Sequence, residues 1–378
     1  MASPAPDHAP RILHPLMGCD LNTLLTVSAS SGAVAPRFIP HLSLAIATAL
    51  ARLPVTAIEN WKLQRRTTDN LSERAAPIFI VGHWRSGTTF LYELLCHSQQ
   101  FAYVSPFSTG LPWEFLTLGA LLRPLLTQAL PADRFIDGIQ VTPSSPQEDE
   151  IALANMQSLS FYHGLYFPAQ LQQHFNRGIF FDGCTTEQIA HWQQAVTLFF
   201  RKLQLETPDK PLLIKNPVYT ARVAMLRQMY PDAKFIHIYR NPYVVFQSMR
   251  NFYRKLLNQL ALQKFDAGAM ADLTDALTLQ SYPRMMDALL RDVSDLPSAQ
   301  YVELRFEDFE QDPVGHVEAI YRQLGLGEFD AVRDRFVQYL EANRRYRKNQ
   351  YRFPPEDNQR VYACWQTFID RWGYAPEG

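Results

Sequence analysis

One stretch of the sequence combines residue types that bind anions. An apolar run from Ile78 to Val81 ends at Gly82, and leucines at helical spacing follow from Leu91. A strand, a glycine-flanked turn and a helix N-terminus in this order direct backbone N–H groups and the helix dipole at one point. The pattern therefore predicts an anion-binding loop with the polar members Arg85, Ser86, Gly87, Thr88 and Thr89. The alternative is an ordinary strand–turn–helix with a surface arginine.

The loop differs from the P-loop of nucleotide triphosphatases at the residue that reaches the phosphates. That loop reads G-x-x-x-x-G-K-[ST]. Gly82 and Gly87 keep its spacing, but Thr88 takes the place of the lysine, and the cation, Arg85, comes before the second glycine. Such a loop can hold a phosphate-like group without being built for Mg²⁺–triphosphate chemistry.

A second stretch, residues 231–248, places a cation and a hydroxyl near the end of another strand. The apolar run 234–239 ends before Arg240, Asn241-Pro242 turns the chain, and a helix then carries Ser248 about two turns further on. An arginine at the carboxyl edge of a sheet and a hydroxyl on the next helix can jointly hold a phosphate. The alternative is a surface arginine and a neutral helix serine.

Together the two stretches resemble a known pattern. The segments GHWRSGTT (82–89) and YRNPYVVFQS (239–248) resemble the 5′- and 3′-phosphate signatures of sulfotransferases that use 3′-phosphoadenosine 5′-phosphosulfate (PAPS). Further segments resemble the bacterial-type branch of that family: SPQEDE (145–150), LLIKNPVY (212–219) and RFEDFEQDP (305–313), which IYRQLGL (320–326) follows. The resemblance covers residues 77–350 and implies a sulfotransferase with PAPS as its donor and no metal.

The resemblance also implies roles for individual residues. The loop residues 85–89 would hold the 5′-phosphosulfate, and Arg240 with Ser248 would hold the 3′-phosphate. Lys215 matches the lysine that stabilises charge on the departing phosphate, so Arg85 and Lys215 are the expected catalytic cations. The basic stretch 344–349, with Arg347 and Lys348, resembles a late loop that closes over the nucleotide; its alternative is a solvated helix end.

The general base is expected among three consecutive acids. Residues 103–106, where some family members carry a glutamate, contain no carboxylate. The candidates are Glu148, Asp149 and Glu150. Three consecutive acids cannot share one helical face, so at most two of them enter the cleft, and we expect Glu150, then Glu148, to take the acceptor's proton. Ser145 is the expected N-cap of this helix, with Glu148 at N3 of a capping box. The alternatives are histidines: His83, His97, His163 and His237.

Composition limits the classes of function. The 378 residues carry a net charge of −1 and are 47% hydrophobic, which indicates a sizeable core and gives no sign of a nucleic-acid partner. The four cysteines, Cys19, Cys96, Cys184 and Cys364, have no disulfide or metal spacing. Scattered thiols and the lack of a signal-peptide pattern predict a cytoplasmic protein.

The elements that must position these residues form an α/β pattern. Strand-type runs at 78–81, 212–214, 234–239 and 301–304 are separated by helical segments, among them 187–206. This alternation predicts a parallel sheet with helices on both faces. The family resemblance further implies a three-layer, P-loop-like fold. We expect a helical N-terminal extension over residues 1–76, loosely ordered up to residue 36, and a catalytic domain over 77–378. Proline-punctuated residues 107–138 are expected to form short helices as a wall or lid.

The N-terminal helix predicted over residues 40–66 includes the longest apolar segment. Leu42 to Leu53 is too short to span a bilayer, contains Arg52 and is followed by Pro54. We expect this segment to pack against the domain, with a membrane surface as the less expected partner.

The acceptor cannot be identified from the sequence. Residues 107–130 and 151–181 are rich in aromatic residues and leucine, which favours an apolar or amphiphilic alcohol or a glycolipid as strongly as plain core packing. Two other functions stay open: a P-loop-like nucleotide kinase and a nucleotide-binding scaffold without turnover. The oligomeric state cannot be predicted.

Overall fold

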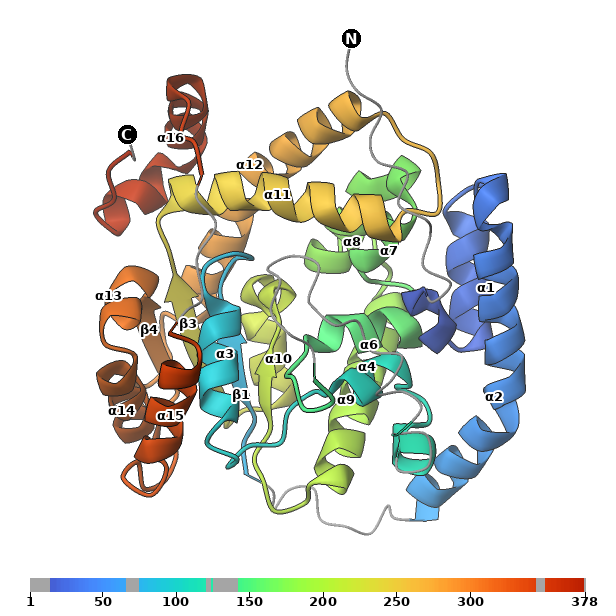
Figure 1. Cartoon of the computed structure of the whole chain (residues 1–378), viewed down its shortest axis with the longest axis horizontal. Coiled ribbons are helices and arrows are strands. Elements are labelled where there is room, and N and C mark those ends of the chain that lie inside the picture. Colours follow the sequence, from blue (N-terminus) through green and yellow to red (C-terminus); the bar gives the residue numbers. More distant parts are fainter. Residues whose placement is uncertain (1–13, 66–74, 120–123, 125–141, 345–350, 377–378) are drawn as a thin grey trace.

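A four-stranded parallel sheet forms the centre of the molecule (Figure 1). The computed structural model describes residues 14–65, 75–119, 124, 142–344 and 351–376. In spatial order the strands are β2 (Leu213–Lys215), β1 (Ile78–Val81), β3 (Lys234–Tyr239) and β4 (Tyr301–Arg305). All neighbours pair in parallel, so every carboxyl end lies at the same edge. The four predicted strands are confirmed, with β2 shifted by one residue and β4 extended by one.

Helices pack on both faces of the sheet, against strand side chains that point alternately to the two sides. Phe79, Ile214 and Phe235 face α9 (Thr186–Glu206), where Trp192 and Phe199 are buried. The neighbouring strand residues face α3 (Thr88–Cys96) and α14 (Pro313–Leu324) in a second cluster, which includes Ile78, Ile80, Leu213, Ile236, Ile238, Leu91, Leu95, Val317 and Ile320. Because strand side chains alternate between faces, both sides are apolar and the three-layer fold follows.

Further helices lie beyond the carboxyl edge of the sheet. A third cluster of buried residues joins α7 (Tyr162–Tyr166), α8 (Leu171–Phe180), α11 (Pro242–Leu260), α12 (Ala267–Asp292) and α16 (Pro355–Arg371). In Figure 1, α11 runs across the molecule above the strands. The remaining helices are α4 (Pro106–Gly110), α6 (Asp149–Met156), α10 (Val223–Met229), α13 (Phe306–Gln311) and α15 (Arg333–Ala342), with short 3₁₀ turns such as η1 (Pro15–Gly18).

The N-terminal extension contains one helix that sequence analysis missed. Residues 21–30 form α1 (Leu21–Ser30), whereas we had expected residues 1–36 to be loosely ordered. Its serines and threonines favour caps and turns over helix interiors, but burial of Leu24 and Val27 and the cap from Asp20 outweigh that preference. The predicted helix over residues 40–66 is confirmed as α2 (Ile39–Arg65).

The predicted wall of short helices is described only in part. Helix α4 and a helical turn at residues 115–119 lie within residues 107–138, and most of the remainder lies outside the described residues. All four cysteines are free, and Cys19 and Cys96 are buried.

Candidate active site

The glycine-flanked loop turns from β1 into α3 through three residues of positive φ. Gly82 has a φ of 144°, Arg85 a φ of 70° and Gly87 a φ of 94°. A Cβ atom on Gly87 would lie 2.1 Å from the ring of Phe306, so only glycine fits there. Gly87 is the N-cap of the nine-residue helix α3 and supplies no side-chain cap. The first N–H groups of α3 are therefore available to an anion, as the loop pattern predicts.

Hydrogen bonds join this loop to the second predicted anion site. The Nε of Arg85 donates to the hydroxyl of Ser248 at 2.8 Å, and that hydroxyl lies 2.9 Å from the hydroxyl of Tyr351. Arg240 Nη1 donates to the backbone oxygen of Arg85 at 3.4 Å. The two sequence motifs, more than 150 residues apart, thus meet in one place at the carboxyl edge of the sheet.

Arg240 lies against an aromatic ring rather than at the surface. Its guanidinium lies 4.5 Å from the ring centre of Phe306, the residue that also fills the space beside Gly87. Burial lowers the pKa of Arg240; the carboxylate of Glu307 opposes that shift, and the charge of Arg85 adds to it. Two neighbouring guanidinium groups of like charge favour a bound anion between them.

Lys215 lies at the carboxyl edge of the sheet and is paired there with the carboxylate of Glu148. It is paired with Ile80 in the sheet register, at the strand end that leads into the loop. Its ammonium forms an ion pair with Glu148, and the two side chains are 5% and 18% exposed. Glu148 is thus the most accessible of the three acids, because Asp149 and Glu150 are both 0% exposed.

The predicted capping box at the start of α6 is wrong. Helix α6 begins at Asp149, and Glu148 is its N-cap without a side-chain cap. The Ser145 hydroxyl instead accepts a hydrogen bond from the backbone N–H of Thr142 at 2.9 Å. The backbone N–H of Gln147 donates to Val104 at 2.9 Å, which keeps this segment extended. The capping pattern predicted Glu148 as the helical residue N3. It is instead the N-cap, and its side chain forms the ion pair with Lys215.

Asp149 and Glu150 form a buried network around one amide. Asn216 Nδ2 donates to Asp149 at 2.9 Å and to Glu150 at 3.1 Å. Tyr219 donates to Asp149, and Ser160 donates to Glu150 at 2.7 Å. Burial raises the pKa of Glu150, and it raises that of Asp149 to about 8. These acids fix the strand end that carries Lys215 and have no exposed surface toward a substrate.

The raised pKa of Asp149 predicts a pH-dependent stability. Its carboxyl loses its proton near pH 3.8 in the unfolded chain but only near pH 8 in the folded protein, so the free energy of unfolding falls as pH rises between these values. We expect Asp149→Asn to flatten this fall, because asparagine keeps the shape and does not titrate. Urea denaturation at several pH values measures the slope. Asp295→Asn is the control, since the Arg227 hydrogen bond lowers the pKa of Asp295, and it should keep the wild-type slope.

Two of the histidine alternatives are buried and neutral. His83 shares a hydrogen bond with the carbonyl of Trp84, and burial lowers its pKa to about 4. His163 contacts the carbonyl oxygens of Ala154 and Ser158, with its pKa also lowered to about 4 by burial. Arg347 and Lys348 lie outside the described residues, whereas Tyr351, just after them, reaches Ser248.

Three residues around the site escaped sequence analysis. Asn216 follows Lys215 directly, and its amide was detectable as a side chain at the same strand end. Phe306 begins the segment after β4 but carries no polar group that would single it out. Tyr351 belongs to no motif, and its pairing with Ser248 spans 103 residues.

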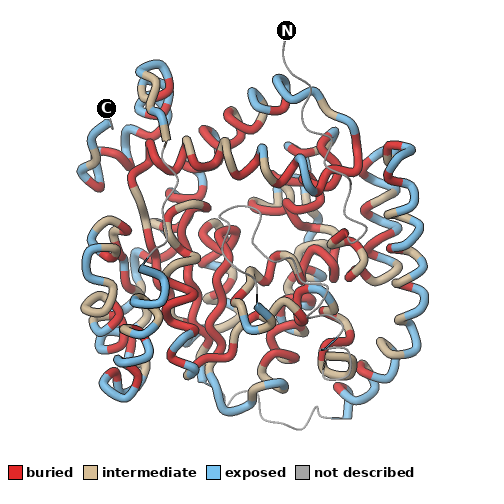
Figure 2. Tube along the Cα trace, in the orientation of Figure 1, coloured by how far each residue is buried: buried red, intermediate tan, exposed pale blue. Residues whose placement is uncertain are grey.

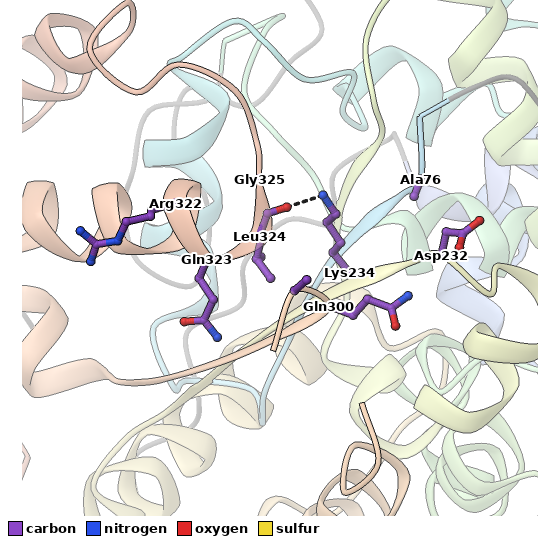
Figure 3. Close-up of a pocket in the computed structure, with 9 residues that line it drawn as sticks. Ala76, Asp232, Lys234, Gln300, Arg322, Gln323, Leu324 and Gly325 are labelled. Carbon is purple, nitrogen blue, oxygen red and sulfur yellow. Dashed lines mark hydrogen bonds between the residues drawn. The ribbon is translucent and has the colours of Figure 1, made fainter. Parts of the chain in front are cut away.

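An open hollow lies at the opposite edge of the sheet (Figure 3). It is lined by Ala76, Asp232 and Gln300, which precede β1, β3 and β4, and Lys234 there donates to the carbonyl of Leu324. It is separate from the anion site because amino and carboxyl ends of parallel strands lie at opposite edges. Among the residues that the structure describes, no group of three or more His, Cys, Asp or Glu side chains could hold a metal ion.

Comparisons with known proteins identify the family. A sequence model described as the sulfotransferase family matches residues 77–331. The omega-hydroxy-beta-dihydromenaquinone-9 sulfotransferases Stf3 of Mycobacterium bovis and Mycobacterium tuberculosis are each 30% identical over 298 residues, which is 79% of this chain and 75% of theirs.

Solved structures share the fold. Sulfotransferase STF9 from Mycobacterium avium superposes with a TM-score of 0.69 at 16% identity, over 94% of this chain and 91% of that one. STF1 from Mycobacterium tuberculosis gives a TM-score of 0.64 at 20% identity, over 91% of each chain. The matched family model spans β1 to β4, and with them both motifs predicted to bind anions and Lys215. The chain therefore belongs to the sulfotransferase family and is an enzyme that transfers a sulfuryl group to a hydroxyl.

Proposed function

We propose that this sulfotransferase uses PAPS as its donor and sulfates a hydroxyl of an amphiphilic lipid. The observation that carries the donor is the contact of Arg85 with Ser248, which joins the loop at α3 to the strand end at Arg240. A site built from two adjacent guanidinium groups, one helix N-terminus and two hydroxyls fits a ligand that is anionic at both ends. The fit does not require a metal ion.

The residues divide between the two ends of the nucleotide. Arg85, Ser86, Gly87, Thr88 and Thr89 would hold the 5′-phosphosulfate through the N-terminus of α3. Arg240 and Ser248 would hold the 3′-phosphate, and the Tyr351 hydroxyl is placed to join them. When bound, PAPS supplies an activated sulfuryl group whose leaving group is a phosphate.

Lys215 and Glu148 are the groups best placed to act on the acceptor. The ammonium has three N–H donors, so Lys215 can keep its bond to Glu148 and still stabilise developing negative charge. Glu148 is the general base in this proposal, and its carboxylate takes the proton of the acceptor hydroxyl. Glu150, which sequence analysis placed first, is the weaker candidate, since both of its oxygens are bonded in the interior.

The lipid class of the acceptor rests on the relatives. The two Stf3 proteins are sulfotransferases of a hydroxylated menaquinone derivative. The aromatic residues that suggested an apolar pocket give less support, because Phe115, Phe161, Tyr166 and Phe167 are buried within the hydrophobic clusters. A long isoprenoid alcohol is therefore the first acceptor to test.

The test is transfer of radiolabelled sulfate from PAPS. The enzyme is incubated with detergent-solubilised alcohols of an isoprenoid quinone, with a disaccharide as the polar comparison, and labelled products are separated by chromatography. We expect label in the isoprenoid alcohol and little in the sugar. Label in the sugar alone would reject the lipid acceptor, and no label with either would leave the donor proposal without support. ATP labelled on its γ-phosphate, with Mg²⁺ and in place of PAPS, tests the kinase alternative, for which we expect no transfer of labelled phosphate.

A further inference from the structure

Helix α2 turns its polar side toward the protein. Arg52 Nη1 donates to Glu114 at 2.6 Å, and Thr56 donates to the same carboxylate. One turn further, Glu59 forms an ion pair with Lys202 at 2.7 Å in which both side chains are 1% exposed. The inward face of α2 thus combines these ion pairs with apolar packing: Ala45, Ala49 and Leu63 are buried, and Leu42 and Ile46 pack, partly buried, against the core.

A second set of apolar residues on the same helix faces outward. Ile39, Leu44, Leu50, Leu53, Ile58 and Trp61 are each between 37% and 52% exposed, and Leu25 of the adjacent α1 is 51% exposed. Among the described residues, Tyr362 is the other large hydrophobic side chain with comparable exposure. The two helices form one edge of the molecule in Figure 1, and the outer edge is pale blue and tan along most of its length in Figure 2. We call these seven outward side chains the α1/α2 face.

The charges around this face have one sign. Between Ile39 and Trp61 the charged residues are Arg52 and Glu59, and both pair inward. Exposed cations lie at the two ends of α2: Arg37, 4.6 Å from the ring of Phe38, and Lys62 and Arg65, the latter 3.8 Å from the ring of Trp61. An apolar stripe with basic and aromatic residues at its ends is typical of helices that lie in a membrane interface.

We propose that the α1/α2 face binds the surface of a bilayer that contains anionic lipids, with α2 parallel to the membrane plane. The segment 36–65 is long and apolar enough to cross a membrane, and only 11% of its most apolar window is buried within the protein. A crossing would carry Arg52 and Glu59 into hydrocarbon and separate them from Glu114 and Lys202, which is costly. Lying in the plane keeps both ion pairs and removes the exposed side chains from water.

A second copy of the chain suits this face less well. In a two-fold contact with antiparallel helices, Arg37 of one copy would meet Lys62 and Arg65 of the other, and like charges would repel. Anionic headgroups complement both ends at once.

The face is also connected to the active site, because η1 contacts α2, α4 and α6, and Glu148 is the N-cap of α6. The inference does not depend on the donor or acceptor proposed above.

The experiment is flotation of the full chain with phosphatidylcholine vesicles, with and without phosphatidylglycerol. We expect the protein to float with the anionic vesicles and the double variant Leu50→Glu/Leu53→Glu to bind them at least about tenfold more weakly, since both side chains are exposed and their burial is lost. Tyr362→Glu, which changes an exposed aromatic residue on α16, should bind as the wild type does. Circular dichroism and the melting temperature show that each variant is folded.

Several outcomes would overturn the proposal. Recovery of the wild type free of both vesicle types would overturn it, and so would equal flotation of the wild type and the double variant. A dimer in analytical ultracentrifugation that Leu50→Glu/Leu53→Glu converts to a monomer, without vesicle binding by the wild type, would assign the face to a second copy. Nucleotide binding is the independent readout. Adenosine 3′,5′-bisphosphate should raise the melting temperature of the double variant as it does that of the wild type. A failure of vesicle binding can therefore be distinguished from a failure of the donor proposal.

Discussion

Replacing Glu148 by glutamine is expected to lower kcat by about 10²–10⁴-fold, the usual contribution of a general base. Glutamine keeps the length of the side chain and an oxygen for the ammonium of Lys215, but it cannot accept the acceptor's proton at neutral pH. Nucleotide binding should change little, because Glu148 is the N-cap of α6 and lies outside the loop 85–89. Steady-state transfer of labelled sulfate gives kcat, and titration calorimetry with adenosine 3′,5′-bisphosphate gives the nucleotide affinity.

Glu150→Gln is the matched control for this substitution. It makes the same chemical change two residues away, at a carboxylate bonded to Ser160 and Asn216. We expect lower stability but a kcat of the folded fraction close to that of the wild type. The reverse result, with Glu150→Gln inactive while folded and Glu148→Gln active, would return the role of the base to Glu150. The greater accessibility of Glu148 would then not be sufficient to identify the general base in this site.

Local sequence patterns were sufficient for the sheet and for the anion-binding loop. A strand, a turn and a helix start are fixed by neighbouring residues, so Ile78 to Val81 and Gly87 could be placed from spacing alone. The start of α6 could not, because the ion pair that holds Glu148 comes from Lys215, 67 residues later. The capping pattern at Ser145 was a valid local preference that a long-range contact overrode.

Helix α2 is a second case in which long-range contacts limit what the local sequence predicts. The apolar residues of α2 suggested a segment packed against the domain, since burial is the common use of such a helix. The first half of α2 does pack in this way, at Ala45 and Ala49. The inward side of the second half is fixed by Glu114 and Lys202, which are 62 and more residues away and pair with Arg52 and Glu59. A burial pattern set by distant charges cannot be predicted from the hydrophobicity of the segment itself.

Replacing Arg240 by methionine is expected to remove the preference for 3′-phosphorylated nucleotides. The guanidinium lies over Phe306 and next to Arg85, so a charge-assisted contact with a 3′-phosphate, worth about 1.5–3 kcal/mol, would be lost. That corresponds to a dissociation constant for adenosine 3′,5′-bisphosphate about 10–100-fold higher. The affinity for adenosine 5′-phosphate, which lacks the 3′ group, should change much less. Methionine keeps an apolar contact with the ring, which limits disturbance of the loop at Gly87.

Arg284→Met controls for the loss of an arginine on an aromatic ring. Arg284 lies 3.8 Å from the ring centre of Phe180 and pairs with Asp182, away from the loop. It should bind both nucleotides as the wild type does. Equal weakening of both nucleotides by Arg240→Met would show that Arg240 supports the loop through Phe306 and not the 3′-phosphate. Unchanged affinity for both would remove Arg240 from the site, and the 3′-phosphate would then have to be held by Ser248 and Tyr351.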